Sequence, residues 1–314
     1  LIMTTSPAPF YKDIATAPEG VECLWLHTKD GTRIRLAIWG AGKKGTIFLM
    51  PGRTEYIEKY GKSVHNYIDA GYSVVVIDWR GQGLADRDTP LHGVGHVDNF
   101  VQFQDDLDTA LEVINERALP QPMFLIGHSM GGAIGLRALH RLDVFKAAVF
   151  SGPMWGITMK PALRPIAWAL GIGSEAIGKS KWLAPGYSEE SYTTSAEFKD
   201  NLLTGDPEMF TFLKDQLAAY PALSLGGPSV GWGYEGLREC KKLAALPAPK
   251  QPSLTVYGEK EGIVVIDAII DQVAKWPNGS LKMYENGNHE TMMEVAAIRE
   301  DFFARSIAFF DANS

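Results

Sequence analysis

The pentapeptide Gly127-His128-Ser129-Met130-Gly131 follows the short apolar run Met123–Ile126 and comes just before the helical stretch Ala133–Leu142. A sharp turn from a strand into a helix strains the backbone of its central residue, and the residues two before and two after must be small. The two outer glycines of the motif meet that need. Without this setting, a glycine-rich turn with a helix-capping serine would fit as well. The setting predicts a nucleophile elbow with Ser129 at its tip.

The place of Ser129 at the start of a helix predicts acyl-transfer chemistry. The helix dipole is positive there, and the backbone N–H of Met130 can face a developing oxyanion. A serine nucleophile also needs a base, and in this fold the triad follows the order serine, acid, histidine along the chain. Of the seven histidines, only His289 comes after the last predicted strand, Ser280–Glu285. We therefore predict His289 as the general base.

The acid of the triad is expected in the loop after the predicted strand Ser253–Gly258. This loop offers Glu259 and Glu261, and Asp267 lies further along. We favour Glu261, three residues past the end of the strand, because Asp267 is expected inside the next helix. A glutamate can replace the more common aspartate, because its task is to hold the tautomer of His289 and stabilise the imidazolium.

A second oxyanion donor is expected in the turn that follows the early strand Thr46–Met50. This turn reads Pro51-Gly52-Arg53-Thr54-Glu55, and in the nucleophile-elbow fold an N–H from this loop completes the oxyanion hole. We assign that role to the backbone N–H of Arg53. A simple proline-glycine turn is the alternative interpretation.

The rest of the chain predicts an α/β-hydrolase fold, with a mostly parallel central sheet, helices on both faces and an inserted helical cap. The hairpin strands Cys23–His27 and Arg33–Trp39 are expected at the sheet edge. Between residues 153 and 249 strand patterns vanish, and four of the eight tryptophans appear. We expect a core of residues 1–152 and 250–314 and a cap of residues 153–249. Further strands and helices are expected at Ser73–Asp78, Met123–Gly127, Ala147–Ser151, Ile57–Asp69, Val97–Ala118, Val265–Trp276 and Val295–Asp311.

Composition narrows the classes of partner. The chain has 314 residues, with 46% apolar and 21% charged, as in ordinary folded domains. Thirty basic and 37 acidic residues give a net charge of −7 without any basic block, so nucleic acid is a poor partner. No apolar stretch reaches the roughly 18 residues of a membrane span. The segment 1–7 lacks the pattern of a signal peptide, and Met3 is a candidate native start, so we expect a cytoplasmic protein.

Neither a cofactor nor a metal is expected. Cys23 and Cys240 lie far apart without ligand spacing, and buried free thiols are the simplest interpretation. The glycine-rich segment Asp78–Gly83 matches no phosphate-binding motif and is expected to be a tight loop. His96 and Asp98 resemble metal ligands only in composition.

Several motifs together give the chain a family likeness. They are Pro51–Glu55, Ile77–Gly83, Gly95–Val97, Gly127–Ile134, Pro153–Ile157 and Gly226–Pro228. In these segments the chain resembles the bacterial lysophospholipase L-two group of the monoacylglycerol-lipase-like α/β-hydrolases, over roughly residues 45–311. The resemblance implies a cofactor-free serine hydrolase of monoacyl lipid esters, with Ser129, His289 and the Arg53 and Met130 amides in the roles given above. Relatives commonly have His-Gly in place of Pro51-Gly52, and many have aspartate in place of Glu261.

The substrate expected from this likeness is a small lipid ester. The apolar cap residues Met154, Trp155, Ile157 and Trp168 are candidates for lining an acyl channel. A general carboxylesterase or a prolyl-aminopeptidase-like amidase is the nearest alternative, and a non-catalytic lipid or signal receptor is another. An exposed apolar face of the cap would allow loose contact with a membrane surface, although the net charge of −7 opposes attraction to anionic lipid. The sequence leaves the oligomeric state open.

Overall fold

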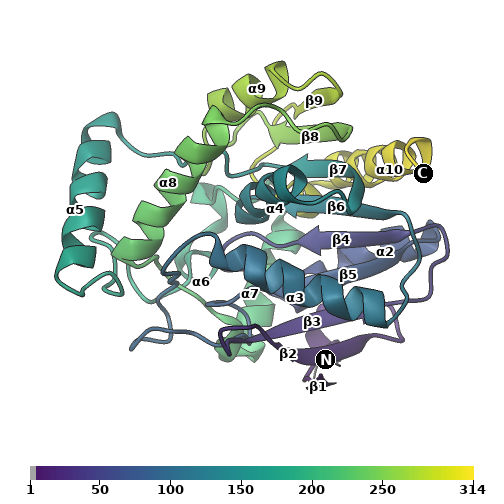
Figure 1. The fold of residues 1–314 in the computed structure, drawn as a ribbon, viewed down its shortest axis with the longest axis horizontal. Helices are drawn as coiled ribbons and strands as arrows, with labels where there is room; N and C mark the ends of the chain where they lie inside the picture. The colour runs from purple at the N-terminus through teal and green to yellow at the C-terminus, as the bar shows by residue number, and fades with distance from the viewer. Residues whose placement is uncertain (1–4) are drawn as a thin grey trace.

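The computed structural model describes residues 5–314 and is built around one nine-stranded sheet. Residues 1–4, which include the candidate start Met3, lie outside the described part. The strands are β1 (Ser6–Pro7), β2 (Glu22–His27), β3 (Arg33–Trp39), β4 (Thr46–Met50), β5 (Ser73–Asp78), β6 (Met123–His128), β7 (Phe145–Ser151), β8 (Ser253–Gly258) and β9 (Gly279–Tyr284). Their order is β1-β2-β3-β5-β4-β6-β7-β8-β9 (Figure 1). The six neighbouring strands β5, β4, β6, β7, β8 and β9 pair in parallel. The pairs β1–β2, β2–β3 and β3–β5 are antiparallel.

The central strands are short apolar runs because both faces of the sheet are covered. Every residue of β4, β5 and β6 is buried, the pattern typical of a parallel sheet between two layers of helices. The predicted antiparallel hairpin is present as β2 and β3, but β1 pairs outside β2. The edge of the sheet is therefore β1, whose two residues gave no strand pattern.

Helices pack on both faces of the sheet, as the sequence predicts (Figure 1). They are α1 (Lys12–Ala15), α2 (Gly61–Asp69), α3 (Gln102–Glu116), α4 (Met130–Arg141), α5 (Arg164–Ala176), α6 (Tyr192–Ser195), α7 (Pro207–Ala219), α8 (Val230–Ala245), α9 (Ile266–Ala274) and α10 (Ala296–Ala312). Apolar side chains of α3, α4 and α9 share one core cluster with the sheet. Those of α2 and α10 share the cluster on the opposite face.

Two expected helices start later than predicted. The segment Ile57–Tyr60 is a 3-10 turn, and the α-helix begins only at Gly61. Residues 97–101 precede α3 as irregular chain, because the Asn99 side chain accepts a hydrogen bond from the Val101 N–H at 3.0 Å. Asparagine favours such local turns over helix interior. The helical spacing of apolar residues continues through this turn, so the sequence predicts a helix that begins earlier than α3.

Residues 153–249 contain helices and 3-10 turns but no named strand. Within this segment α5 and α8 lie side by side at one end of the molecule (Figure 1). Both cysteines are free thiols, but only Cys240 is buried, whereas Cys23 is half-buried. Among residues 5–314, no helix combines the length and apolar character needed to cross a bilayer.

Candidate active site

The turn between β6 and α4 has the geometry of a nucleophile elbow. Ser129 has φ 50° and ψ −118°, in the positive-φ half of the backbone map that non-glycine residues seldom occupy. A Cβ on Gly131 would lie 2.0 Å from the Met50 carbonyl oxygen, and one on Gly127 would lie 2.8 Å from the Gly131 oxygen. Side chains at these two positions would clash with backbone. The close packing holds Ser129 at the tip of the turn, between a buried strand and the start of a helix.

His289 lies in the loop after β9 and is hydrogen-bonded to Glu261, which lies in the loop after β8. The Nδ1 atom of His289 is 2.6 Å from Oε2 of Glu261. The other oxygen of Glu261 accepts hydrogen bonds from the N–H groups of Ile263 at 2.7 Å and Val264 at 3.1 Å. Burial acts to raise the pKa of Glu261, but His289 and these N–H groups outweigh burial and lower the pKa below its usual 4.5. Glu261 is therefore held as a carboxylate against the ring.

The two alternative acids lie elsewhere. Glu259 accepts a hydrogen bond from the backbone N–H of Asn286 at 2.9 Å, and Asp267 is in the first turn of α9. Glu261 is therefore the carboxylate of this group that contacts His289.

The turn after β4 packs directly against the elbow, because β4 and β6 are parallel neighbours. A Cβ on Gly52 would lie 3.0 Å from the Cβ of Ser129. Met130 is the first residue of α4, so its N–H has no partner within the helix. Within residues 5–314 no hydrogen bond from the Arg53 N–H is found. The two candidate oxyanion donors are therefore the N–H of Met130, next to Ser129 in the chain, and the N–H of Arg53, in the turn that packs against Ser129.

Ser129 and His289 line one cavity of about 450 Å³. Its walls come from the turn after β4, from the loops after β7, β8 and β9, and from residues 187–232. Apolar side chains form much of the wall: Met154, Ile157, Leu202, Leu203, Leu213, Leu217, Trp232, Ile263 and Val264. A largely apolar cavity with a few converging polar groups is typical of a small-molecule site.

Comparison with known proteins identifies the family. Residues 41–296 match the family Hydrolase_4, described as serine aminopeptidase, S33. The chain belongs to this family. It is 27% identical over 275 residues to the probable lysophospholipase L2 of Haemophilus influenzae, a match that covers 85% of this chain and 84% of that protein. It is also 26% identical to the monoacylglycerol lipase of Mycolicibacterium smegmatis, over 84% of this chain and 88% of that one.

Solved structures share the fold of this Hydrolase_4 protein. One is a soluble variant of the Saccharomyces cerevisiae monoglyceride lipase with a substrate analog, with a TM-score of 0.71, 19% identity and coverage of 98% of this chain and 100% of that one. Another is the Paleococcus ferrophilus monoacylglycerol lipase, with a TM-score of 0.69, 20% identity and coverage of 90% and 99%. At these identities the likeness shows the α/β-hydrolase fold, as predicted.

Two of the four predicted lining residues of the Hydrolase_4 chain are on the cavity and two are not. Met154 and Ile157 line it, whereas Trp155 and Trp168 line a separate surface pocket. Trp155 is buried, and its indole N–H donates to the Gly132 carbonyl at 3.1 Å. Trp168 packs edge-on against Tyr234 at 5.4 Å between ring centroids. Trp168 thus joins α5 to α8, and Trp155 ties the loop after β7 to α4, so neither lines the cavity that holds Ser129.

Sequence reasoning missed several polar residues around the site. Gln82 Nε2 donates to the backbone oxygens of Gly52 at 2.7 Å and Glu55 at 3.1 Å, and thereby fixes the turn that carries the Arg53 N–H. Glu55 accepts a short hydrogen bond from the N–H of Gly52. Gln82 lies in the motif Ile77–Gly83 and Glu55 in the motif Pro51–Glu55, but nothing in the sequence indicates where their side chains point.

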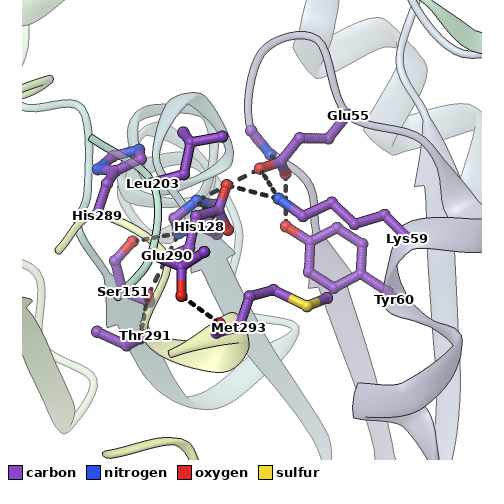
Figure 2. Close-up of polar contacts among 12 residues, drawn as sticks. Glu55, Lys59, Tyr60, His128, Ser151, Leu203, His289, Glu290, Thr291 and Met293 are labelled. Carbon is purple, nitrogen blue, oxygen red and sulfur yellow. Dashed lines mark hydrogen bonds and ion pairs between the residues drawn. The ribbon is translucent and has the colours of Figure 1, made fainter. Parts of the chain in front are cut away.

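Three side chains, Glu55, His128 and Glu290, converge closely enough to hold a metal ion. However, the ammonium of Lys59 lies 2.5 Å from Glu55 Oε1 and 2.6 Å from Glu290 Oε1. A cation of the chain itself therefore compensates the two carboxylates, which assigns this group to ion pairing (Figure 2).

The motif residues outside the site have structural contacts. Asp78 accepts hydrogen bonds from the Ile57 and Leu84 N–H groups, each at 2.9 Å, so it holds the tight loop that was expected. His96 is 2.8 Å from Asp98 and 2.7 Å from the hydroxyl of Ser229. These contacts tie the loop before α3 to the start of α8.

Proposed function

We propose that the protein hydrolyses the carboxylic ester of monoacyl lipids through an acyl-enzyme on Ser129. The observation that carries this proposal is the shared cavity: a strained serine and a histidine bonded to a buried glutamate line the same apolar space. Relatives named lysophospholipase and monoacylglycerol lipase, which align over most of the chain, support the substrate class.

In this proposal each residue has one role. Ser129 attacks the ester carbonyl while His289 removes its proton, and the N–H groups of Arg53 and Met130 hold the oxyanion. His289 then protonates the leaving alcohol. Glu261 holds Nδ1–H of the ring, which leaves Nε2 free to exchange protons with the serine. A water activated by the same histidine releases the fatty acid, and the enzyme returns to its starting state.

The division into core and cap supports substrate selection. We propose residues 1–152 and 250–314 as the core and 153–249 as the cap. The core supplies Ser129 and His289, and the cap supplies apolar wall residues such as Leu213, Leu217 and Trp232. An acyl chain would lie against these side chains.

The side chain of Arg53 favours a head group that contains phosphate. It lines the cavity, and its Nη2 donates to the Gly226 carbonyl at 2.7 Å, while the guanidinium lies 5.0 Å from the ring centre of Trp232. Among residues 5–314 no carboxylate is found to act on this guanidinium, and Nε is buried without a hydrogen-bond partner. Burial lowers the pKa of Arg53 to about 10. A phosphate diester would compensate this charge, since guanidinium binds phosphate through paired hydrogen bonds.

The cap also presents a surface suited to lipid. Leu163, Ile166, Leu170 and Ile177 are exposed and spaced to share one face of α5 and its flanks. Between residues 160 and 181 the chain has four basic residues and one acidic residue, so the local charge is positive although the whole chain is acidic. We propose loose contact of this face with the surface of a membrane that contains the substrate.

A substitution of Ser129 tests the mechanism. Ser129→Ala is expected to lower kcat on monoacylglycerol, lysophosphatidylcholine and p-nitrophenyl butyrate by at least about 10⁴-fold, because it removes the nucleophile. It is also expected to abolish labelling by a fluorophosphonate probe. Residual activity above a tenth of wild type would contradict the acyl-enzyme.

The same panel separates the alternatives. Preference for short aryl esters over both lipids would favour a general carboxylesterase, and turnover of proline anilide would favour an amidase. A wild-type protein that binds lipid but neither turns over any ester nor takes the label would be a receptor.

A further inference from the structure

Four buried charged side chains lie beside His289 and form what we call the charge cluster: Glu55, Lys59, His128 and Glu290 (Figure 2). None is more than 6% exposed. They come from the turn after β4, the 3-10 turn that follows, the end of β6 and the loop after β9. The mechanism proposed above uses none of them, although burying four charges is costly unless they are paired.

His128 is held as an imidazolium by its surroundings. Its Nδ1 lies 2.9 Å from the backbone oxygen of Ser151, which can only accept, so Nδ1 carries a proton. Its Nε2 lies 3.4 Å from Glu55 Oε1 and 3.3 Å from Glu290 Oε2. Nε2 makes no hydrogen bond among the described residues, but a neutral ring would hold its lone pair beside two carboxylates, which favours a proton on Nε2 as well. Burial lowers the pKa of His128, but attraction to Glu290 and Glu55 outweighs burial and raises it above 6.5.

The charge cluster is therefore balanced, with two cations and two anions. Lys59 bridges the two carboxylates at 2.5 and 2.6 Å. Glu55 Oε2 accepts from the hydroxyl of Tyr60 at 2.5 Å and from the N–H of Gly52. Attraction to Lys59 and His128 overcomes the effect of burial and holds the pKa of Glu290 well below 4.5. The removal of any one member leaves an uncompensated charge.

His289 lies directly against this cluster. Its ring centre is 4.8 Å from that of His128, and Glu290 is its neighbour in the chain. Among the charged groups around His289, Glu261 contacts its Nδ1. His128 and Glu290 are the cluster members beside it, and Lys59 and Glu55 lie beyond them (Figure 2). At such a distance inside a protein, one uncompensated charge acts strongly on a neighbouring ring.

We propose that the charge cluster acts electrostatically on His289. Its zero net charge sets the pH range over which His289 works as the general base. Glu55, Lys59 and Glu290 also line the cavity that holds Ser129, and the effect assigned to the cluster here is exerted through His289. This inference rests on the proposed serine-esterase function. It assigns opposite effects to the two kinds of charge: loss of an anion disfavours the protonated ring, and loss of a cation favours it.

The pH profile of kcat/KM tests the proposal, with p-nitrophenyl butyrate as a soluble substrate. The acidic limb of this profile reports protonation of the base in the free enzyme. Glu290→Gln is expected to move the limb about one pH unit lower, and Lys59→Met about one unit higher. The double variant restores the balance and is expected to return the limb close to its wild-type position.

Two exposed residues provide matched controls. Glu285→Gln and Lys260→Met remove the same charges on the chain segments that flank His289 and Glu261, but in water, where screening leaves little effect. Their acidic limbs are expected to stay within about 0.2 units of wild type. If Lys59→Met does not fold, His128→Gln removes a cation from the other side and is expected to move the limb in the same upward direction.

The outcomes distinguish three cases. Opposite shifts that cancel in the double variant support the proposal. Loss of kcat in both single variants, with no shift or with shifts in the same direction, would mean that the cluster only holds the fold together and would overturn it. If wild type shows no Ser129-dependent hydrolysis of any ester, the proposed function itself fails, and no pH profile of this kind exists.

Discussion

Ser129 shows how neighbours fix one reactive side chain. Its backbone angles are unfavourable for a residue with a Cβ, yet its N–H donates to the Ser151 oxygen at 3.1 Å and its carbonyl accepts from the Met154 N–H at 2.8 Å. Two glycines allow the flanking backbone to approach closely. The backbone contacts of Ser129 with β7 and with the loop after β7, together with the turn itself, therefore position the hydroxyl. A hydrogen bond to the hydroxyl oxygen is not needed for this.

Substitution of Arg53 tests the choice of head group. Arg53→Met is expected to lower the ratio of kcat/KM for lysophosphatidylcholine to kcat/KM for monoacylglycerol of the same acyl chain by about tenfold or more, because a charge-assisted hydrogen bond to phosphate is lost. Arg53→Lys keeps the charge and is expected to lose less of the ratio. The ratio is the readout because the Arg53 N–H also belongs to the proposed oxyanion hole.

The remote variant Arg141→Met removes a positive charge paired with Asp108 outside the cavity and is expected to leave this ratio unchanged. Equal loss on both substrates in Arg53→Met would mean that the side chain only supports the turn after β4. Phosphate would then have to be recognised elsewhere or not at all.

The candidate site could be predicted only in part from individual residues. Chain order pointed to Ser129 and His289, and Glu261 followed from its place after β8, because these signals depend on the order of strands. Trp155 lines a different pocket from Ser129, which the sequence could not indicate, because apolar character does not tell which cavity a side chain faces. His128 and Glu290 were within or beside predicted motifs, but their ion pairs join segments far apart in the chain, which no local pattern reveals.

At the scale of elements, α5 is a 13-residue helix with little apolar packing, and Gly171 is its one buried residue. Its residues are mostly exposed, whereas α4 is largely buried between the sheet and its neighbours. A surface helix normally hides its apolar face. An exposed apolar face needs a partner. In our proposal, that partner is the surface of a membrane that contains the substrate.

Serine substitutions on this face test the contact. Ile166→Ser combined with Leu170→Ser is expected to lower the rate on monoacylglycerol in phosphatidylcholine vesicles by about fivefold or more, since each buried side chain contributes of the order of 1 kcal/mol or more. Hydrolysis of soluble p-nitrophenyl butyrate is expected to stay unchanged. Vesicle sedimentation measures binding directly.

Ile270→Ser on α9 is the matched control, because Ile270 is exposed to a similar degree, at 39%, on another helix. It is expected to bind vesicles like wild type. Equal vesicle activity of the α5 variant and wild type would show that this face does not meet lipid.

Elements were predictable where burial was complete. The strands of the parallel sheet stood out as short apolar runs, because both of their faces are covered. The two-residue β1 gave no signal at all. The segment before α3 was misread, because Phe100 packs into the core from irregular chain and so continues the helical spacing of apolar residues without any helix.

The charge cluster also affects the stability of the whole molecule through pH. The pKa of His128 is raised above 6.5, so its contribution to the free energy of unfolding is complete below pH 6.5 and is lost as the pH rises through the folded-state pKa. The pKa of Glu290 is lowered below 4.5, so its contribution is complete above pH 4.5 and is lost as the pH falls through its folded value. The cluster therefore stabilises most between these two limits.

We expect His128→Gln to lower Tm most near pH 6. The Tm difference from wild type should narrow as the pH is raised above 6.5, because wild type then loses up to about 1.4 kcal/mol per pH unit from this group. Thermal unfolding at pH 6, 7.5 and 9 measures the change. His65→Gln, at an exposed histidine, should show a flat difference, and an equally flat result for His128→Gln would contradict a protonated His128.

The split of the sheet around residues 153–249 has a consequence during synthesis. The ribosome makes Ser129 160 residues before His289, and β8, β9 and α10 complete the core last. A nascent chain can therefore form the elbow but has no base to activate it. In our proposal, reactivity toward esters arises only after His289 has been made, so products of translation that is interrupted before this residue would be unable to attack lipid.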